Sequence, residues 1–165
     1  MRLYHASASV IEHPDVFHSR KYLDFGQGFY LTSLYEQAIQ YAKRFLGKNS
    51  QAYVNVYELS DDIQDIRKKV FEHYDAEWLD FIGNCRKGLP VETYDMIEGG
   101  IANDRVFNTL DLFFNGLISR DETLGRLVFE HPNHQLCILN QSIIDKYLYF
   151  VEAQEIKQGG NYASE

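Results

Sequence analysis

Cysteine is scarce in this sequence, with only two among 165 residues. Cys85 and Cys137 lie far apart and form no Cys-x-x-Cys pattern. Disulfide frameworks and thiolate metal sites both need several cysteines at short, regular spacings. We therefore expect a protein of a reducing compartment, with no disulfide framework and no bound metal.

Positive charge is the second shortage. Lysine and arginine number 16 against 24 aspartate and glutamate residues, which gives a formal net charge of -8. A general nucleic-acid binder relies on a basic surface that attracts phosphates regardless of base sequence. This sequence argues against that class of protein, although a specific contact with a nucleic acid stays open.

Long apolar runs are also missing. A helix that spans a bilayer needs about 20 consecutive apolar residues, and no stretch approaches that length. The start, Met1–His5, lacks the apolar run that follows the charged start of a secretory signal. We expect a soluble cytoplasmic protein with no membrane contact.

Internal repeats and low-complexity tracts are absent as well. A chain of 165 residues has the size of one ordinary domain, and its 45% of hydrophobic residues is enough for a core. We predict a single domain over residues 1–157 and a flexible tail over residues 158–165.

The first half of the chain carries clear helix and strand signals. Leu3 and Tyr4 can form a short strand, and residues 28–32 suit a buried strand because they are aromatic and apolar. Ser33 and Glu36 have the spacing of a capping box, which predicts a helix to about Leu46. Gly47 then stands where a left-handed C-terminal cap is usual.

The rest of the chain mixes both kinds of element. Residues 52–59 and 94–97 favour strands, residues 63–85 favour a helix, and Asp104 and Ser119 can each cap a further helix. The runs 135–139 and 147–154 also favour strands and can pair side by side. Because strands and helices do not alternate regularly, we predict an α+β fold with a mostly antiparallel sheet.

Three segments of the chain resemble the signature elements of ADP-ribosyltransferases in the diphtheria-toxin and poly(ADP-ribose) polymerase branch. The first is Leu3-Tyr4-His5-Ala6-Ser7. The resemblance implies that His5 binds a ribose hydroxyl of NAD and that the backbone of Ala6, beside Ser7, pairs with the nicotinamide amide. Ala6 replaces the usual glycine of the family, but its backbone groups remain available.

The second segment, Asp24–Thr32, resembles the Gly-x-Gly-Phe-Tyr strand of the same family. The resemblance implies that Tyr30 and Thr32 contact NAD, with the pyrophosphate over the loop at Gly26 and Gly28. In the family a second tyrosine follows eleven residues later, and Tyr41 stands at that spacing. Two phenol rings can sandwich a pyridinium ring and favour its positive charge through stacking and cation–π attraction.

The third segment, residues 133–139, resembles a late strand that the family opens with glutamate, and Gln135 stands at that position. A carboxylate can stabilise the positive charge that develops on the ribose, whereas an amide offers hydrogen bonds only. The chain also resembles a small bacterial family of undefined function on the same fold, in which an Ala-Asn-Asp turn accompanies these segments. We therefore nominate Asn103 and Asp104 as further catalytic residues, with Glu98 as a weaker candidate.

The resemblance implies a split antiparallel sheet with flanking helices, and a mono-ADP-ribosyltransferase that uses NAD without a metal. Its acceptor is then a protein or a nucleic acid. Small bacterial members of this branch are often toxins of toxin–antitoxin or phage-defence modules, which implies a neutralising antitoxin partner. The alternative is a sensor that binds NAD or ADP-ribose without turnover. An RNA 2′-phosphotransferase is disfavoured because the chain has few basic residues.

Each nominated residue also has a purely structural interpretation. A lone histidine after a strand is usually structural, and Tyr30 and Tyr41 have the character of core aromatics. Gly26-x-Gly28 precedes a strand rather than a helix, so a plain turn is an alternative to a phosphate site. Asp104 can be a helix cap. The cluster at residues 130–134 contains Pro132, which favours a polar loop over a zinc site.

Overall fold

The computed structural model describes residues 1–47, 51–102, 104–160 and 162, and within them the chain forms an α+β fold with two sheets. The first sheet is antiparallel, with strand order β1-β3-β7. Its strands are β1 (Arg2–Ser7), β3 (Tyr53–Leu59) and β7 (Leu148–Glu155). The predicted α+β class is therefore confirmed.

The second sheet has the order β2-β6-β5-β4. Its strands are β2 (Phe29–Leu31), β6 (Gln135–Ile138), β5 (Met96–Gly99) and β4 (Lys68–Phe71). All neighbours are antiparallel except β4 and β5, which are parallel. The two sheets meet where Tyr4 and Thr32 exchange backbone hydrogen bonds of 2.8 and 2.9 Å.

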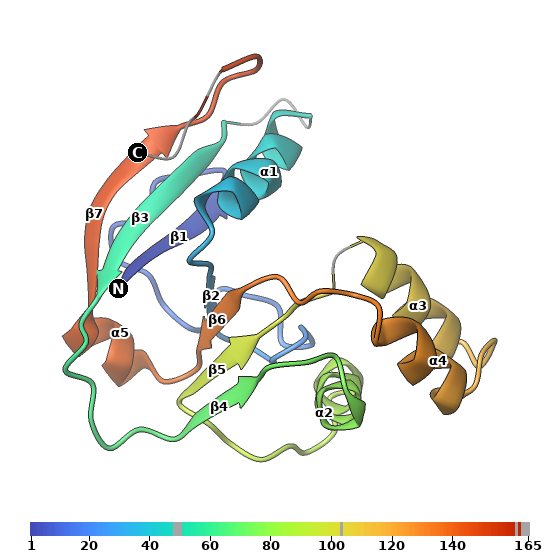
Figure 1. Cartoon of the computed structure of the whole chain (residues 1–165). Helices are drawn as coiled ribbons and strands as arrows, with labels where there is room; N and C mark the ends of the chain where they lie inside the picture. The colour runs from blue at the N-terminus through green and yellow to red at the C-terminus, as the bar shows by residue number, and fades with distance from the viewer. Residues whose placement is uncertain (48–50, 103, 161, 163–165) are drawn as a thin grey trace.

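The helices pack against the sheets in separate groups (Figure 1). Helix α1 (Tyr35–Leu46) packs on the first sheet through Ala38, Ile39 and Ala42, and Tyr162 from the C-terminal segment packs against the same cluster. The second sheet packs on three helices, which are α2 (Ala76–Lys87), α3 (Asp104–Phe114) and α4 (Arg120–Leu127). A third cluster fills the space between the sheets beside α5 (Gln141–Tyr147).

The helix predicted over residues 63–85 is wrong in its first half. Residues 68–71 form β4, which pairs with β5, and α2 begins only at Ala76. The Asp75 side chain accepts a hydrogen bond from the Trp78 N–H and so caps α2, while Gly88 ends it in the left-handed conformation. Pairing with a distant strand therefore decided a segment whose local pattern favoured a helix.

Two predicted helix caps also differ from the structure. Leu34, not Ser33, is the N-cap residue of α1, and its aliphatic side chain cannot accept a hydrogen bond; the Ser33 hydroxyl is hydrogen-bonded to His134. Gly47 has a φ of -63° rather than a left-handed conformation. The cap at Ser119 is confirmed, since its side chain accepts from the Glu122 N–H.

The two last strands do not pair with each other. β6 lies in the second sheet and β7 in the first, because the unpredicted helix α5 turns the chain between them. The strand predicted at residues 94–97 is present two residues later, as β5. No helix within the described part of the chain has the length and apolar character that crossing a bilayer requires.

Candidate functional site

His5 and Tyr30 meet at the junction of the two sheets. The Nδ1 atom of His5 lies 2.7 Å from the main-chain oxygen of Tyr30. A carbonyl can only accept, so Nδ1 carries the proton and Nε2 is left with a lone pair. The half-buried ring stacks on Phe29 with a centroid distance of 4.6 Å, and burial lowers the pKa of His5. Within the described residues, Nε2 has no hydrogen-bond partner and remains a neutral acceptor.

Tyr30 is tied into the second sheet by its hydroxyl. That hydroxyl donates to the main-chain oxygen of Gly26 at 2.6 Å and accepts from the Phe25 N–H at 3.1 Å. The ring stacks on Phe25 at a centroid distance of 6.4 Å. Burial raises the pKa of Tyr30, so the phenol stays neutral. Tyr30 therefore supports the loop before β2 as well as facing the helices behind the sheet.

Tyr41 is exposed on the surface of α1. It lies on α1 with 50% of its surface exposed, so the core interpretation of Tyr41 is wrong. Arg44 stacks over its ring at 5.2 Å, and Phe45 meets it edge-on. Among the described residues the rings of Tyr30 and Tyr41 are not in contact. The structure therefore places one tyrosine in the wall of the second sheet and leaves the other accessible.

Gly26 and Gly28 are explained by local packing. Gly26 has a φ of +84°, and its N–H donates to the Leu23 oxygen in a turn. A Cβ at Gly28 would lie 2.6 Å from the Cys137 sulfur. The Gly28 N–H donates to the Ser19 hydroxyl. Both amides are already used inside the chain, so this loop as folded presents neither of them to a phosphate.

Gln135 shares a face of the second sheet with Tyr30. Tyr30 pairs with Cys137, and Gln135 lies two residues from Cys137 on the same strand. Paired residues and residues two apart point to the same side of a sheet. Within the described residues, the Gln135 amide has no hydrogen-bond partner. Its backbone pairs with Gly99, which has no side chain to cover it.

The remaining nucleotide-binding candidates make structural contacts near the junction of the two sheets. Thr32 is buried, and its hydroxyl accepts from the Leu34 N–H at the start of α1. Ala6 packs against the α1 cluster. The Ser7 hydroxyl accepts from the Ser9 N–H in the loop after β1. These contacts fix where β1 leaves the junction.

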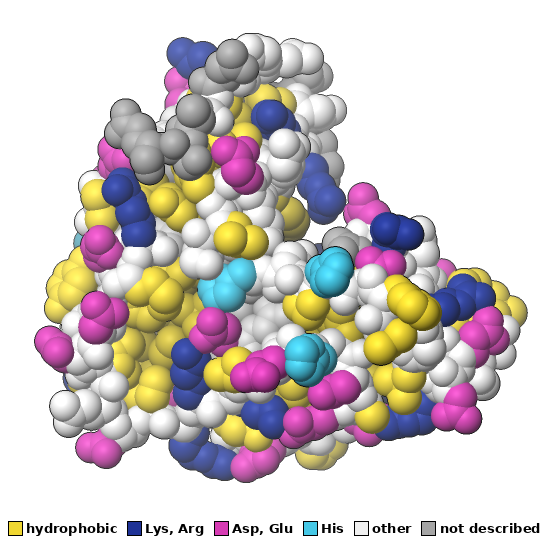
Figure 2. Space-filling view, viewed as in Figure 1, with side chains coloured by type: hydrophobic (Ala, Val, Ile, Leu, Met, Phe, Trp, Pro, Cys, Tyr) yellow, Lys and Arg dark blue, Asp and Glu magenta, His cyan; other side chains and the backbone are white. Residues whose placement is uncertain are grey.

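Asp104 is the first residue of α3 rather than a cap before it, so the cap prediction is wrong. Its side chain is 93% exposed and lies 3.5 Å from Arg44 of α1. This ion pair joins the two groups of helices, and Figure 2 shows a notch in the surface between them with charged side chains on both rims. Asn103, the other nominated residue of the turn, lies outside the described residues.

A buried acceptor without a partner lies one turn before Tyr41 on α1. The Oε1 atom of Gln37 is buried and unpaired among the described residues, while its Nε2 donates to the main-chain oxygen of His134 at 3.0 Å. Residues four apart lie on the same face of a helix. Gln37 therefore contacts the chain just before β6, next to Gln135, and Tyr41 lies on the same face of α1.

Sequence reasoning nominated Glu98 as a weaker candidate but missed the chain of side chains that joins it to Ser33 at the same end of the second sheet. The Ser33 hydroxyl lies 2.9 Å from His134 Nδ1, and His134 Nε2 lies 2.8 Å from Glu98 Oε1. Lys68 Nζ lies 2.6 Å from the other Glu98 oxygen. Burial alone would raise the Glu98 pKa, but bonds from Lys68 and His134 outweigh it and lower the pKa. The signals were the serine before α1 and the histidine before Gln135, which were interpreted as a cap and a loop residue.

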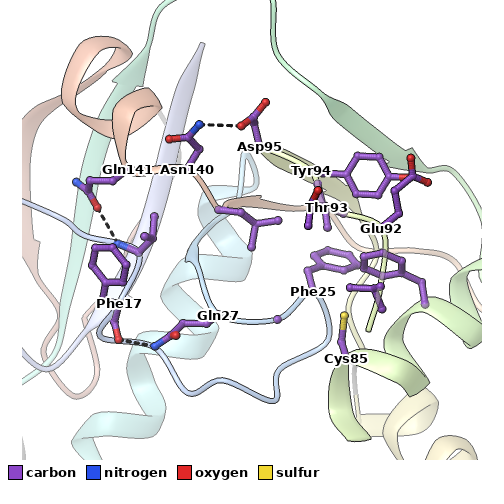
Figure 3. A pocket seen from close by; sticks show the side chains of 16 residues that line it. Phe17, Phe25, Gln27, Cys85, Glu92, Thr93, Tyr94, Asp95, Asn140 and Gln141 are labelled. Carbon is purple, nitrogen blue, oxygen red and sulfur yellow. Dashed lines mark hydrogen bonds between the residues drawn. The ribbon is translucent and has the colours of Figure 1, made fainter. Parts of the chain in front are cut away.

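A wide cavity lies elsewhere on the second sheet. It has a volume of about 610 Å³ and opens where β6 ends and β5 begins, with Phe17, Phe25 and Phe81 among its apolar lining (Figure 3). Its polar groups bind one another, as when Asn140 Nδ2 donates to Asp95 at 2.7 Å. His5, Tyr30 and Gln135 do not line it. Among the described residues, no three histidine, cysteine or acidic side chains are grouped closely enough to hold a metal ion.

The comparisons with known proteins identify a family without an assigned activity. No curated protein and no solved structure is significantly similar to this chain. Residues 1–150 match a family described as a protein of unknown function (DUF3990). That match covers most of the chain, from β1 into the last strand. The chain therefore belongs to the DUF3990 family.

Proposed function

We propose that this protein is an NAD-dependent mono-ADP-ribosyltransferase. The observation that carries the proposal is the hydrogen bond from His5 Nδ1 to the Tyr30 oxygen, which joins the first two signature segments at the junction of the sheets. The division of the strands into two largely antiparallel sheets agrees with the split sheet that the resemblance implied. The orphaned acceptor of Gln37 beside Tyr41 adds support, because a ligand amide would satisfy it.

Each residue then has a definite part in binding. The free Nε2 atom of His5 accepts a hydrogen bond from a ribose hydroxyl. The exposed ring of Tyr41 stacks on the nicotinamide, with Tyr30 forming the opposite wall. The unpaired amide of Gln135 orients the ribose. Gly26 and Gly28 contribute by shaping the loop that holds the Tyr30 hydroxyl, rather than by binding the pyrophosphate.

The positive charge that develops on the ribose needs a negative group to stabilise it, and the candidate lies on the rim of the notch between α1 and α3. NAD supplies a glycosidic bond that breaks as nicotinamide leaves with the bonding electrons, and a nucleophile of the acceptor then bonds to the anomeric carbon. Gln135 has no charge with which to stabilise this step. The Asp104 carboxylate at the start of α3 is accessible, so we assign the charge role to it and propose that it orients the acceptor together with Asn103.

Nicotinamide release from NAD tests the proposal directly. The purified protein should release nicotinamide and label an acceptor in a lysate supplied with labelled NAD. Tyr41→Ala should abolish most of this activity, whereas Tyr149→Ala, which removes a tyrosine of comparable exposure on β7, should not. If NAD is neither cleaved nor raises the melting temperature of the protein, the proposal fails.

The biological setting that the proposal favours is a bacterial toxin with a neutralising antitoxin partner. Expression in a bacterial host should then slow growth, and Tyr41→Ala should relieve the effect at equal protein level. Mass spectrometry of the host's proteins and nucleic acids identifies the acceptor class in the same cultures. Equal growth of both strains would exclude toxicity in that host and leave the transferase proposal standing.

The second candidate is a sensor that binds NAD or ADP-ribose without cleaving it. The observation that favours it is the neutral Gln135 at the strand opening, with the Asp104 carboxylate 3.5 Å from Arg44 instead of beside that amide. A sensor would gain thermal stability with NAD or ADP-ribose and release no nicotinamide. Measuring both quantities on one preparation separates the two functions.

A further inference from the structure

Ser33, His134 and Glu98 are arranged as a nucleophile, a base and an orienting carboxylate. His134 Nδ1 accepts from the backbone N–H of Ser33 at 3.1 Å, and an amide can only donate. Nδ1 therefore carries a lone pair, and the proton sits on Nε2, which points to Glu98 at 2.8 Å. It follows that the Ser33 hydroxyl, 2.9 Å from Nδ1, donates its proton toward the base.

The three groups are held from several elements while the serine stays accessible. Glu98 lies on β5 and is bound on its other oxygen by Lys68 of β4, and its lowered pKa keeps it ionised. The backbone of His134 is fixed by Gln37 of α1. The side chains of His134 and Glu98 are only 23% and 26% exposed, whereas Ser33 is exposed in the turn between β2 and α1. The Ser33 hydroxyl is therefore accessible to solvent, beside an imidazole whose position is fixed.

The groups around Ser33 indicate which kind of electrophile its hydroxyl would attack. Helix α1 begins at Tyr35, two residues after Ser33, and within the described part of the chain its N-cap residue, Leu34, makes no side-chain cap. The uncapped N–H groups and the positive end of the helix dipole stabilise negative charge. Acyl transfer develops a negative oxyanion, whereas glycosyl transfer develops positive charge on the sugar. An ester carbonyl is therefore favoured over the anomeric carbon of NAD.

We propose that Ser33 is the nucleophile of a second reactive centre that takes acyl groups from esters, with His134 as general base and Glu98 as its positioning residue. The Ser33 oxygen bonds to the carbonyl carbon while its proton passes to His134 Nδ1. The ester C–O bond then breaks, and the departing alcohol takes that proton. Water releases the acyl group from Ser33 by the same route. The centre needs no NAD.

The test uses the full chain without NAD, so its result is independent of the proposed transferase. Wild-type protein with 4-nitrophenyl acetate should release nitrophenolate and carry an acetyl group on the Ser33 peptide. A fluorophosphonate probe should label the same peptide. Ser33→Ala and His134→Gln should each lower the rate on the order of 100-fold. Ser9→Ala, which removes an exposed serine whose hydroxyl neighbours that of Ser7 instead of an imidazole, should leave the rate unchanged.

The role of Glu98 has its own readout. Glu98→Gln removes the charge that stabilises the protonated imidazole, so the acidic limb of the rate–pH profile should move to lower pH. A merely structural role would change the amplitude and leave the limb in place. Circular dichroism confirms that each variant is folded. Acetylation that is equal in Ser33→Ala, or that is spread over lysines and other serines, would overturn the proposal.

Discussion

The imidazole of His5 lies 2.7 Å, through Nδ1, from the main-chain oxygen of Tyr30, beside the backbone pair of Tyr4 and Thr32 that joins the two sheets. This contact gives His5 a structural role on one ring nitrogen and leaves the other nitrogen free. A proton added to Nε2 removes its lone pair but leaves the hydrogen bond from Nδ1 in place. The structural role and the acceptor role are therefore separable by pH and by substitution.

Stability should fall in acid because of His5. Its pKa is lowered below the ordinary 6.5 by burial, so the unfolded chain takes up a proton before the folded chain does. The neutral ring thus contributes stability above pH 6.5, and that contribution is lost as pH falls toward the lower folded pKa. Urea unfolding at a series of pH values measures this slope, and His5→Gln should flatten it. An identical slope in the variant would show that other groups cause the acid sensitivity.

The hydroxyls of the two tyrosines should have unequal effects on stability. Tyr30→Phe removes the donor to Gly26 and the acceptor for Phe25, which leaves two main-chain groups unsatisfied. We expect a loss of about 1–3 kcal/mol in the free energy of unfolding. Tyr41→Phe should be close to neutral, because no hydrogen bond to that hydroxyl is present among the described residues and half of the side chain is exposed. Equal losses in urea titrations would contradict this assignment.

The fold was predictable where local signals and packing agreed. The helix ending at Leu46 was predictable from its amphipathic pattern although both of its predicted end signals were wrong, and the cap at Ser119 and the strand at 53–59 followed from capping spacing and from β-branched and aromatic composition. Residues 68–71 were not predictable, because β4 exists only through pairing with β5. The separate sheets of β6 and β7 depend on α5, which is too short to give a clear periodic signal.

The candidate site was predictable only in part. That His5 and Tyr30 lie near each other was implied by the resemblance to the ADP-ribosyltransferases, and the two residues do meet at the junction of the sheets. The engagement of the Gly26 and Gly28 amides was not predictable, because it depends on Leu23 and Ser19 in an irregular loop. The chain from Ser33 to Glu98 joins residues far apart in sequence, and the antiparallel registers of β2 with β6 and of β5 with β6 bring them together.

Gly28 should be intolerant of any side chain. In Gly28→Ala the new methyl group would lie 2.6 Å from the Cys137 sulfur and 2.7 Å from the Ile138 oxygen, so β2 and β6 must separate. Overpacking of this kind costs about 1–3 kcal/mol. Gly125→Ala is the control, since nothing lies within 4 Å of its Cβ position in α4 and alanine favours helices. A melting temperature unchanged in Gly28→Ala would show that the strands can yield there.

The partly buried pair of Arg86 and Asp24 should matter more than a surface pair. Arg86 lies 2.6 Å from Asp24 and holds the loop before β2 against α2, and the side chains are 21% and 14% exposed. Arg86→Met leaves the carboxylate without its cation, at a cost of about 1–3 kcal/mol after allowing for solvent screening. Arg126→Met breaks the exposed pair with Glu122 and should cost about 0.3–0.5 kcal/mol. Chemical denaturation of both variants checks the ranking.

Asp104 should affect turnover without affecting the fold. Its side chain is 93% exposed and meets only Arg44 among the residues whose ion pairs are described, so Asp104→Asn should leave the melting temperature unchanged. On the proposed function, the loss of its charge should lower the rate of nicotinamide release about 10-fold to 100-fold while the affinity for NAD stays the same. Asp121→Asn in the first turn of α4 is the matched control. If both variants turn over NAD at the wild-type rate, the carboxylate of Asp104 takes no part, and the charge must come from another group near Gln135.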